Sequence, residues 1–192
     1  MSEEHSEDLE DRIFFLEKQE VTVDDFDAAG FILDIGGGGE GIIGQLKGRQ
    51  VVAVDPSKRE LEEAADGPLK IVMDAGDMRF LDETFEVVTS FFTLLYISGS
   101  EHEKVFREAS RVLKPGGRFL IWDVDLPQRL DEQREVVAFY LSVKLPDSEI
   151  DTGYGTKWPE QRQGLAYYRE LAQQVGFIAC AQSQNGRVFQ LE

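Results

Sequence analysis

The residues best suited to chemistry are a run of glycines after one apolar segment and an acid after the next. Phe31–Ile35 is apolar apart from Asp34, and Gly36–Gly39 follow it directly. Glycine permits positive φ and lets the backbone approach a ligand closely. The second apolar run, Val51–Val54, ends in Asp55. A strand, a glycine turn, a helix and a second strand ending in an acid are typical of sites that hold adenosine-bearing cofactors.

Acids end four successive predicted strands, at Asp34, Asp55, Asp74 and Asp123. Ligands bind at the carboxyl ends of parallel strands in open α/β sheets, so these side chains are expected near one pocket. Acids also cap loops and helix starts, which is the competing explanation, above all for Asp123.

The glycine spacing leaves two cofactor classes open. Gly36, Gly38 and Gly41 satisfy the GxGxxG pattern of nicotinamide-binding domains, with Asp55 where a ribose-binding acid is expected. Against this, Asp34 would face the pyrophosphate of that cofactor at close range, which is unfavourable. S-adenosylmethionine carries a sulfonium and an α-ammonium but no phosphate, so the same acid would have a partner there.

Alternating apolar runs and amphipathic stretches predict the elements that position these residues. Strands are predicted at 31–35, 51–54, 69–73, 86–92, 118–122, 177–183 and 187–191, and helices at 24–29, 40–47, from 57 onward, 100–113 and 163–175. Ser57 is predicted to cap its helix, and Ser100 and Glu103 to form a capping box. Asn185–Gly186 is a strong hairpin signal between the last two strands.

The stretch 135–158 departs from this rhythm. Residues Val137 to Leu145 and Ile150 to Trp158 each alternate with period two, which predicts a β-hairpin; a helix over 131–144 is the competing prediction. The segment Gly153–Trp158 is glycine-hinged and aromatic, as a lid or binding edge over the substrate would be, so two interpretations stay open. The alternative is a hairpin packed on the sheet or an edge used in a homodimer.

The domain prediction separates residues 1–29 from residues 30–192. The first part is predicted to be an acidic segment with short helices, although 12–19 is readable as a helix or as an extended arm. The second part is predicted to be the cofactor-binding domain, with the hairpin inserted at 135–158.

Composition narrows the class of partner. The chain has 37 acidic and 20 basic residues, a formal charge of −17, so nucleic acid and anionic membranes are not expected partners. No apolar run approaches the length of a membrane span and the first residues lack signal-peptide features, so a cytoplasmic location is expected. The single cysteine, Cys180, is predicted to be a buried thiol in a strand, and no cluster has metal-ligand spacing.

Four segments in register resemble the small-molecule type of class I S-adenosylmethionine-dependent methyltransferases, with a methyltransferase-11-like domain. They are ILDIGGGGEG, VVAVDPS, MDAGDMRFLDETFEVVTSFFTLLYI and REASRVLKPGGRFLIWD. The resemblance covers about 30–125 and 163–191. It implies a doubly wound, Rossmann-like α/β fold with a mostly parallel seven-stranded sheet and an antiparallel C-terminal edge. It also implies methyl transfer from S-adenosylmethionine to a small-molecule acceptor. A non-catalytic binding module and an NAD-dependent oxidoreductase are the alternatives.

The same resemblance implies the roles of individual residues. Its cofactor-binding set is Asp34, Gly36, Gly37, Gly38, Asp55, Pro56, Asp74, Ala75, Phe91 and Phe92. The glycines and Asp34 would shape the methionine half, Asp55 would bind the ribose hydroxyls, and Asp74 with the Ala75 N–H would meet the adenine. The two phenylalanines would lie beside the methionine, with plain core packing as the alternative.

Two further expectations concern single residues. Glu40 stands where the family usually has its third glycine, and it is expected to point to solvent. No general base stands out, so the catalytic group is unknown. His102, expected to be exposed in the first turn of a surface helix, and Tyr154 are the weak candidates.

Overall fold

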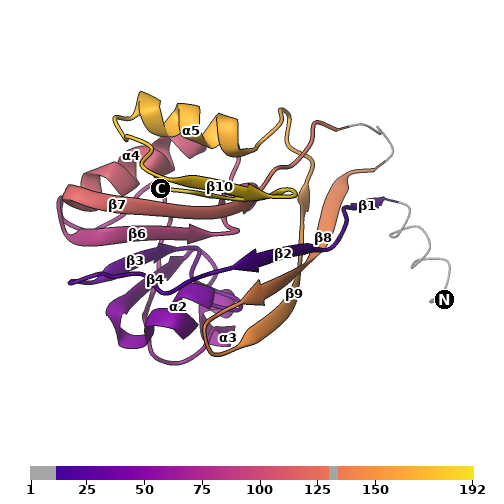
Figure 1. Ribbon diagram of the computed structural model, residues 1–192. Helices are drawn as coiled ribbons and strands as arrows, with labels where there is room; N and C mark the ends of the chain where they lie inside the picture. The colour runs from indigo at the N-terminus through magenta and orange to yellow at the C-terminus, as the bar shows by residue number, and fades with distance from the viewer. Residues whose placement is uncertain (1–11, 130–133) are drawn as a thin grey trace.

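A central sheet of seven strands organises the fold in the computed structural model, which describes residues 12–129 and 134–192. Across the sheet the order is β10 (Gln182–Asn185), β11 (Val188–Leu191), β7 (Leu113–Val124), β6 (Phe85–Phe91), β3 (Ile32–Ile35), β4 (Val51–Asp55) and β5 (Leu69–Val72). Strands β3 to β7 run parallel, and β11 pairs antiparallel with both β7 and β10. The predicted fold class is confirmed (Figure 1).

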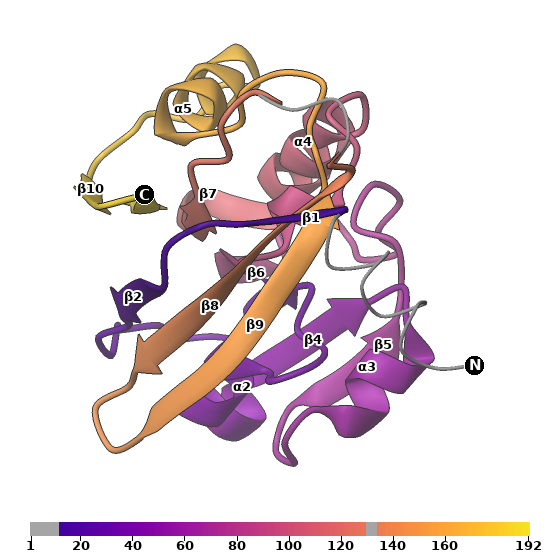
Figure 2. The same cartoon turned by 90° about the vertical axis from the view of Figure 1, so that its right-hand side faces the viewer.

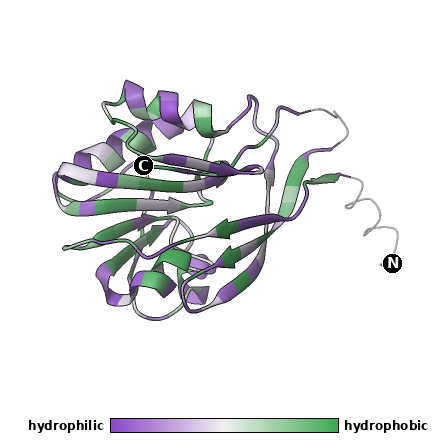
Figure 3. Cartoon of the chain, viewed as in Figure 1, coloured by the Kyte–Doolittle hydropathy of each residue, from purple (hydrophilic) through white to green (hydrophobic). Residues whose placement is uncertain are grey.

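Helices cover the sheet on both faces. They are α2 (Ile42–Lys47), α3 (Lys58–Glu63), α4 (His102–Val112) and α5 (Leu165–Gln174), with short 3₁₀ turns η1 (Gly48–Gln50) and η2 (Leu94–Tyr96). The apolar faces of α4 and α5 pack in one core cluster, and α2 packs in a second one. Figure 3 shows the hydrophobic residues concentrated in the central strands, which are covered on both faces as parallel strands require.

The predicted hairpin is present as β8 (Val136–Lys144) and β9 (Glu149–Lys157), paired antiparallel. The alternating residues Val137, Phe139, Leu141 and Val143 are almost fully buried. They pack in the same core cluster as α2. Figure 2 shows the hairpin crossing in front of the central sheet. The competing helix over 131–144 is therefore wrong where the structure describes it, and the domain division itself stays a prediction.

The N-terminal segment forms strands instead of the predicted short helices. β1 (Ile13–Phe15) and β2 (Gln19–Thr22) both pair in parallel with β8, so the extended arm is the correct alternative for 12–19. Residues 24–29 are irregular, although a helix was predicted there. The tertiary structure overrides the local helix signal in this segment. The chain pairs with the edge of β8 up to Thr22, and the next residue, Val23, is fully buried. Residues 1–11 lie outside the described part.

One smaller prediction is confirmed and three others change. Ser57 does cap α3 through the Glu60 N–H. The prediction of a capping box before α4 is wrong. The helix begins at His102, and the Ser100 hydroxyl is hydrogen-bonded to the Ser98 hydroxyl instead. The strand predicted at 177–183 begins only at Gln182, which pairs with Leu191. Before it, the Cys180 and Ala181 N–H groups donate to the Glu192 carbonyl oxygen. Cys180 is exposed, not buried.

Candidate active site

The glycine turn lies at the point where the strand order reverses. β3 lies between β4 and β6, so the chain continues to one side of β3 and later returns to the other side. Doubly wound sheets bind their ligands at such a switch point. Gly36 leaves β3 with φ 71°, and a Cβ there would lie 2.2 Å from Thr93 Oγ1 at the end of β6. Only glycine allows this close approach, which holds the two strand ends together.

The next two glycines face different neighbours. A Cβ on Gly37 would lie 2.7 Å from Asp34 Oδ2 and 2.8 Å from the Ala53 side chain, so Gly37 faces the sheet. A Cβ on Gly38 would lie 2.6 Å from Glu60 Cβ and 3.0 Å from Asp55 Oδ2. Gly37 therefore permits packing against the sheet, and Gly38 permits the close approach of α3 and of the Asp55 carboxylate.

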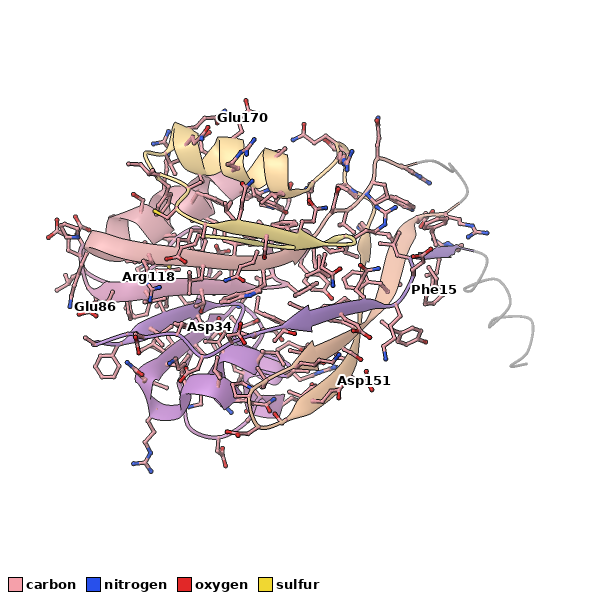
Figure 4. The ribbon with its side chains drawn as sticks, in the orientation of Figure 1. Phe15, Asp34, Glu86, Arg118, Asp151 and Glu170 are labelled. Carbon is pink, nitrogen blue, oxygen red and sulfur yellow. The ribbon has the colours of Figure 1, made fainter. Side chains whose placement is uncertain are left out.

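Asp34 is a buried acid beside this turn. Its side chain lies inside the fold at the end of β3 (Figure 4). Thr89 Oγ1 donates a 2.7 Å hydrogen bond to Oδ1. Burial raises the pKa of Asp34 to about 7, and the charge of Asp55 adds to this effect, while the Thr89 hydrogen bond opposes it. A cation beside Asp34 would favour its charged form.

Asp55 and Asp74 each use one carboxylate oxygen to accept a hydrogen bond from the backbone of the loop that follows. Asp55 Oδ1 accepts from the Ser57 N–H at 2.7 Å, and Asp74 Oδ1 accepts from the Gly76 N–H at 2.6 Å. These bonds fix the direction of each carboxylate and leave the second oxygen for a ligand.

A cavity of about 850 Å³ joins these residues. This size lies within the range of small-molecule sites. It brings together all of the predicted cofactor-binding residues except Gly37: Asp34, Gly36, Gly38, Asp55, Pro56, Asp74, Ala75, Phe91 and Phe92. That they bind a cofactor remains a prediction at the level of single residues.

The charge of the cavity has one sign. Seven carboxylates line it within the described part of the chain, and no Lys, Arg or His does. They are Asp34, Glu40, Asp55, Glu60, Glu63, Asp74 and Glu101. Asp123 is not among them, although it also ends a strand: it is buried behind the cavity, its Oδ1 accepts from the Val124 N–H at 2.7 Å, and burial raises its pKa to about 7.

The hairpin closes one side of the cavity. Gly153 and Tyr154 of β9 line it, and the Tyr154 ring stacks on Phe92 with centroids 5.3 Å apart. Burial, followed by the charge of Glu40, raises the pKa of Tyr154 far above its ordinary value. Tyr154 is therefore a neutral phenol that can donate a hydrogen bond but cannot act as a base. The neighbouring Tyr96, which η2 positions, also lines the cavity.

Glu40 does not point to solvent, contrary to the expectation. It lines the cavity, and its carboxylate accepts a hydrogen bond from the Thr152 hydroxyl of β9. The hairpin lies over the start of α2, so a side chain leaving the glycine loop meets β9 instead of water. Glu40 therefore links the glycine loop to the hairpin.

His102 is buried, and the expectation of an exposed residue is wrong. Its Nδ1 lies 2.9 Å from the Tyr167 hydroxyl and its Nε2 lies 2.9 Å from the Leu94 carbonyl oxygen. Burial lowers the pKa of His102, so the ring is neutral at pH 7. It does not line the cavity. Both ring nitrogens join α4 to η2 and α5, which is a structural role.

A model of the methyltransferase domain family matches residues 33–121, the segment that builds the cavity. Over these residues the chain is similar to S-adenosylmethionine-dependent methyltransferases. S-adenosylmethionine is the cofactor of this class, and a ring of carboxylates fits a cationic nucleoside cofactor.

Curated methyltransferases are similar to this chain over part of their length. The ubiquinone/menaquinone biosynthesis C-methyltransferase UbiE of Desulfotalea psychrophila is 38% identical over 128 residues, which are 62% of this chain and 50% of that protein. The chain spans half or less of the length of the curated relatives it matches.

Two solved structures share the fold. PH0226 from Pyrococcus horikoshii has a TM-score of 0.62 at 22% identity, over 84% of this chain and 81% of that one. An S-adenosylmethionine-dependent methyltransferase from Clostridium acetobutylicum has a TM-score of 0.57 at 15% identity, over 84% and 82%. None of the helices in the described residues has the length and hydropathy that crossing a membrane requires.

Proposed function

We propose that this protein transfers a methyl group from S-adenosylmethionine to a small-molecule acceptor. The observation that carries the proposal is the cavity at the strand switch point, lined by seven carboxylates and no basic side chain among the described residues. A sulfonium and an ammonium gain from such a field, whereas the pyrophosphate of a nicotinamide cofactor is repelled.

The cavity residues suggest how the cofactor is held. Asp34, Gly36 and Gly38 would surround the methionine half, with Phe91 and Phe92 against its apolar part. The free oxygen of Asp55 would bind the ribose hydroxyls, next to Pro56. Asp74 would accept from the adenine amino group, and the Ala75 N–H would donate to the ring. Each position lines the cavity.

The protein's part in the reaction is orientation and exclusion of water. When bound, the cofactor would supply an electrophilic methyl group, and the cavity residues named above would hold it facing the acceptor. The hairpin residues Gly153 and Tyr154 cover the acceptor side, and burial there keeps water away. Neither His102 nor Tyr154 is suited to remove a proton from the acceptor, for the reasons given above.

Calorimetric titration with S-adenosylmethionine, S-adenosylhomocysteine and NAD tests the cofactor. We expect the two sulfur compounds to bind and NAD not to bind. Asp55→Ala should abolish cofactor binding, and Asp77→Ala, which removes an exposed acid that does not line the cavity, should leave it intact. Binding of NAD alone, or full affinity in Asp55→Ala, contradicts the proposal. Tight cofactor binding without methyl transfer to any acceptor would favour a binding module.

A further inference from the structure

The seven cavity carboxylates divide into two groups by their partners. Arg59 Nε lies 3.1 Å from Glu63, and one of its terminal nitrogens lies 3.8 Å from Glu60. Lys104 Nζ lies 2.7 Å from Glu101. These three glutamates therefore have cationic partners of their own at the rim of the cavity, and their charge is in part balanced within the protein.

The other four acids have no ion pair with any described residue. Asp34, Asp55 and Asp74 are the three that the proposed function assigns to the cofactor. Glu40 is the fourth, and the cofactor does not account for it. Its carboxylate accepts hydrogen bonds from two uncharged groups, the Thr152 and Tyr154 hydroxyls, and has no cationic partner among the described residues. A half-buried carboxylate without a cation is costly unless a ligand supplies the charge.

Aromatic rings surround the side of the cavity that Glu40 faces. Tyr154 stacks on Phe92, and its centroid lies 6.3 Å from that of Tyr96. All three rings line the cavity, and Tyr96 is 53% exposed and so free to contact a ligand. Ring faces attract organic cations, and a nearby carboxylate strengthens the attraction.

We propose that the methyl acceptor carries an ammonium group, which Glu40 and the ring faces of Tyr96 and Tyr154 bind. The inference rests on the proposed function and adds the charge class of the substrate. It makes Glu40 a specificity-determining residue. Acceptors with a carboxylate or phosphate near this end are excluded, because the lining offers them no positive partner.

The alternative explanation is that Glu40 has a purely structural role. The two explanations require different chemical properties of the side chain. Holding the Thr152 hydroxyl requires only a hydrogen-bond acceptor, which the amide oxygen of glutamine also provides. Binding an ammonium requires the negative charge. Glu40→Gln removes the charge and keeps the acceptor, whereas Thr152→Val keeps the charge and removes the hydrogen bond.

The experiment measures binding of simple probes by calorimetry in the presence of saturating S-adenosylhomocysteine. The probes are 2-phenylethylamine and butylamine, each compared with the alcohol and the carboxylate of the same carbon skeleton. We expect the amines to bind at least tenfold more tightly than their partners. Glu40→Gln should weaken amine binding at least tenfold, Thr152→Val less than threefold, and both variants should bind S-adenosylhomocysteine within twofold of the wild type.

Several results would overturn the inference while leaving the proposed function in place. They are equal or tighter binding of the alcohols or carboxylates, unchanged amine binding in Glu40→Gln, or no binding of either amine although S-adenosylhomocysteine binds. A larger loss in Thr152→Val than in Glu40→Gln would establish the structural role instead. Failure of the wild type to bind S-adenosylhomocysteine would refute the proposed function, and this inference with it.

Discussion

Asp34→Asn should change how the stability of the protein depends on pH. Asp34 is 2% exposed, and its pKa is raised from 3.8 to about 7, with burial as the largest cause. At a pH between these two values, Asp34 is protonated in the native state and has lost its proton in the unfolded chain. The free energy of unfolding must therefore fall as pH rises through this window and level off above about pH 7.

The size of the effect follows from the two pKa values. Across the whole window they correspond to about 4 kcal/mol, at about 1.4 kcal/mol for each pH unit. Between pH 5 and pH 8 the wild type should lose about 2–3 kcal/mol from this group. Asparagine cannot titrate, and its amide oxygen can still accept from Thr89 Oγ1. The pKa of Asp123 is also raised to about 7. Its contribution to the pH dependence is the same in the wild type and the variant, so it cancels in the difference between them.

Urea unfolding of the wild type and Asp34→Asn at pH 5, 6, 7 and 8, without cofactor, measures this difference. The variant should gain about 2–3 kcal/mol relative to the wild type from pH 5 to pH 8. Asp74→Asn is the control, because it removes an exposed acid from the same cavity. Parallel curves for the wild type and Asp34→Asn, with a relative change below about 1 kcal/mol, would refute the reasoning that burial keeps Asp34 protonated.

Two further substitutions test the turn and the hairpin. Gly36→Ala should lower the free energy of unfolding by about 2–5 kcal/mol, since left-handed backbone strain and a clash with Thr93 add together. Gly39→Ala also has a positive φ, but its Cβ would meet only the Glu60 carboxylate at an ordinary 3.5 Å, so it should lose less than half as much in the same urea assay. Trp158→Ala should cost about 3–5 kcal/mol, because Trp158 is buried against Phe14. Tyr154→Ala should instead raise the acceptor KM and leave the affinity for S-adenosylhomocysteine unchanged, so a large loss of that affinity would place Tyr154 in the cofactor site.

The parallel sheet and its glycine turn could be predicted from the sequence because local signals suffice for them. Continuous apolar runs mark strands that are buried on both faces, and the run of glycines marks a turn whose backbone leaves no room for a Cβ. The parallel direction of the strands then places Asp34, Asp55 and Asp74 at the same edge. The alternation in 137–143 also predicted β8 correctly, since one of its faces packs on the core.

Residues whose surroundings come from distant segments could not be predicted in this way. His102 lies in the first turn of α4, where a polar residue is usually solvated. It is buried because Tyr167 of α5 and the Leu94 carbonyl oxygen of η2 meet its two ring nitrogens. Similarly, β1 and β2 are strands only because β8 offers them an edge. Neither the burial of His102 nor the pairing of β1 and β2 with β8 produces a periodic pattern or a characteristic residue spacing in the sequence.

Glu40 combines both situations, which explains why its role emerges only in the folded protein. Its position in the glycine loop follows from the sequence, and a free carboxylate there would be expected to remain in water. Thr152 and Tyr154 lie more than a hundred residues away, and the β8–β9 pairing carries them over the loop. The carboxylate thus becomes part of the cavity wall, on the side assigned above to the acceptor. A change at this one position can therefore alter which acceptors enter without altering the fold that binds the cofactor.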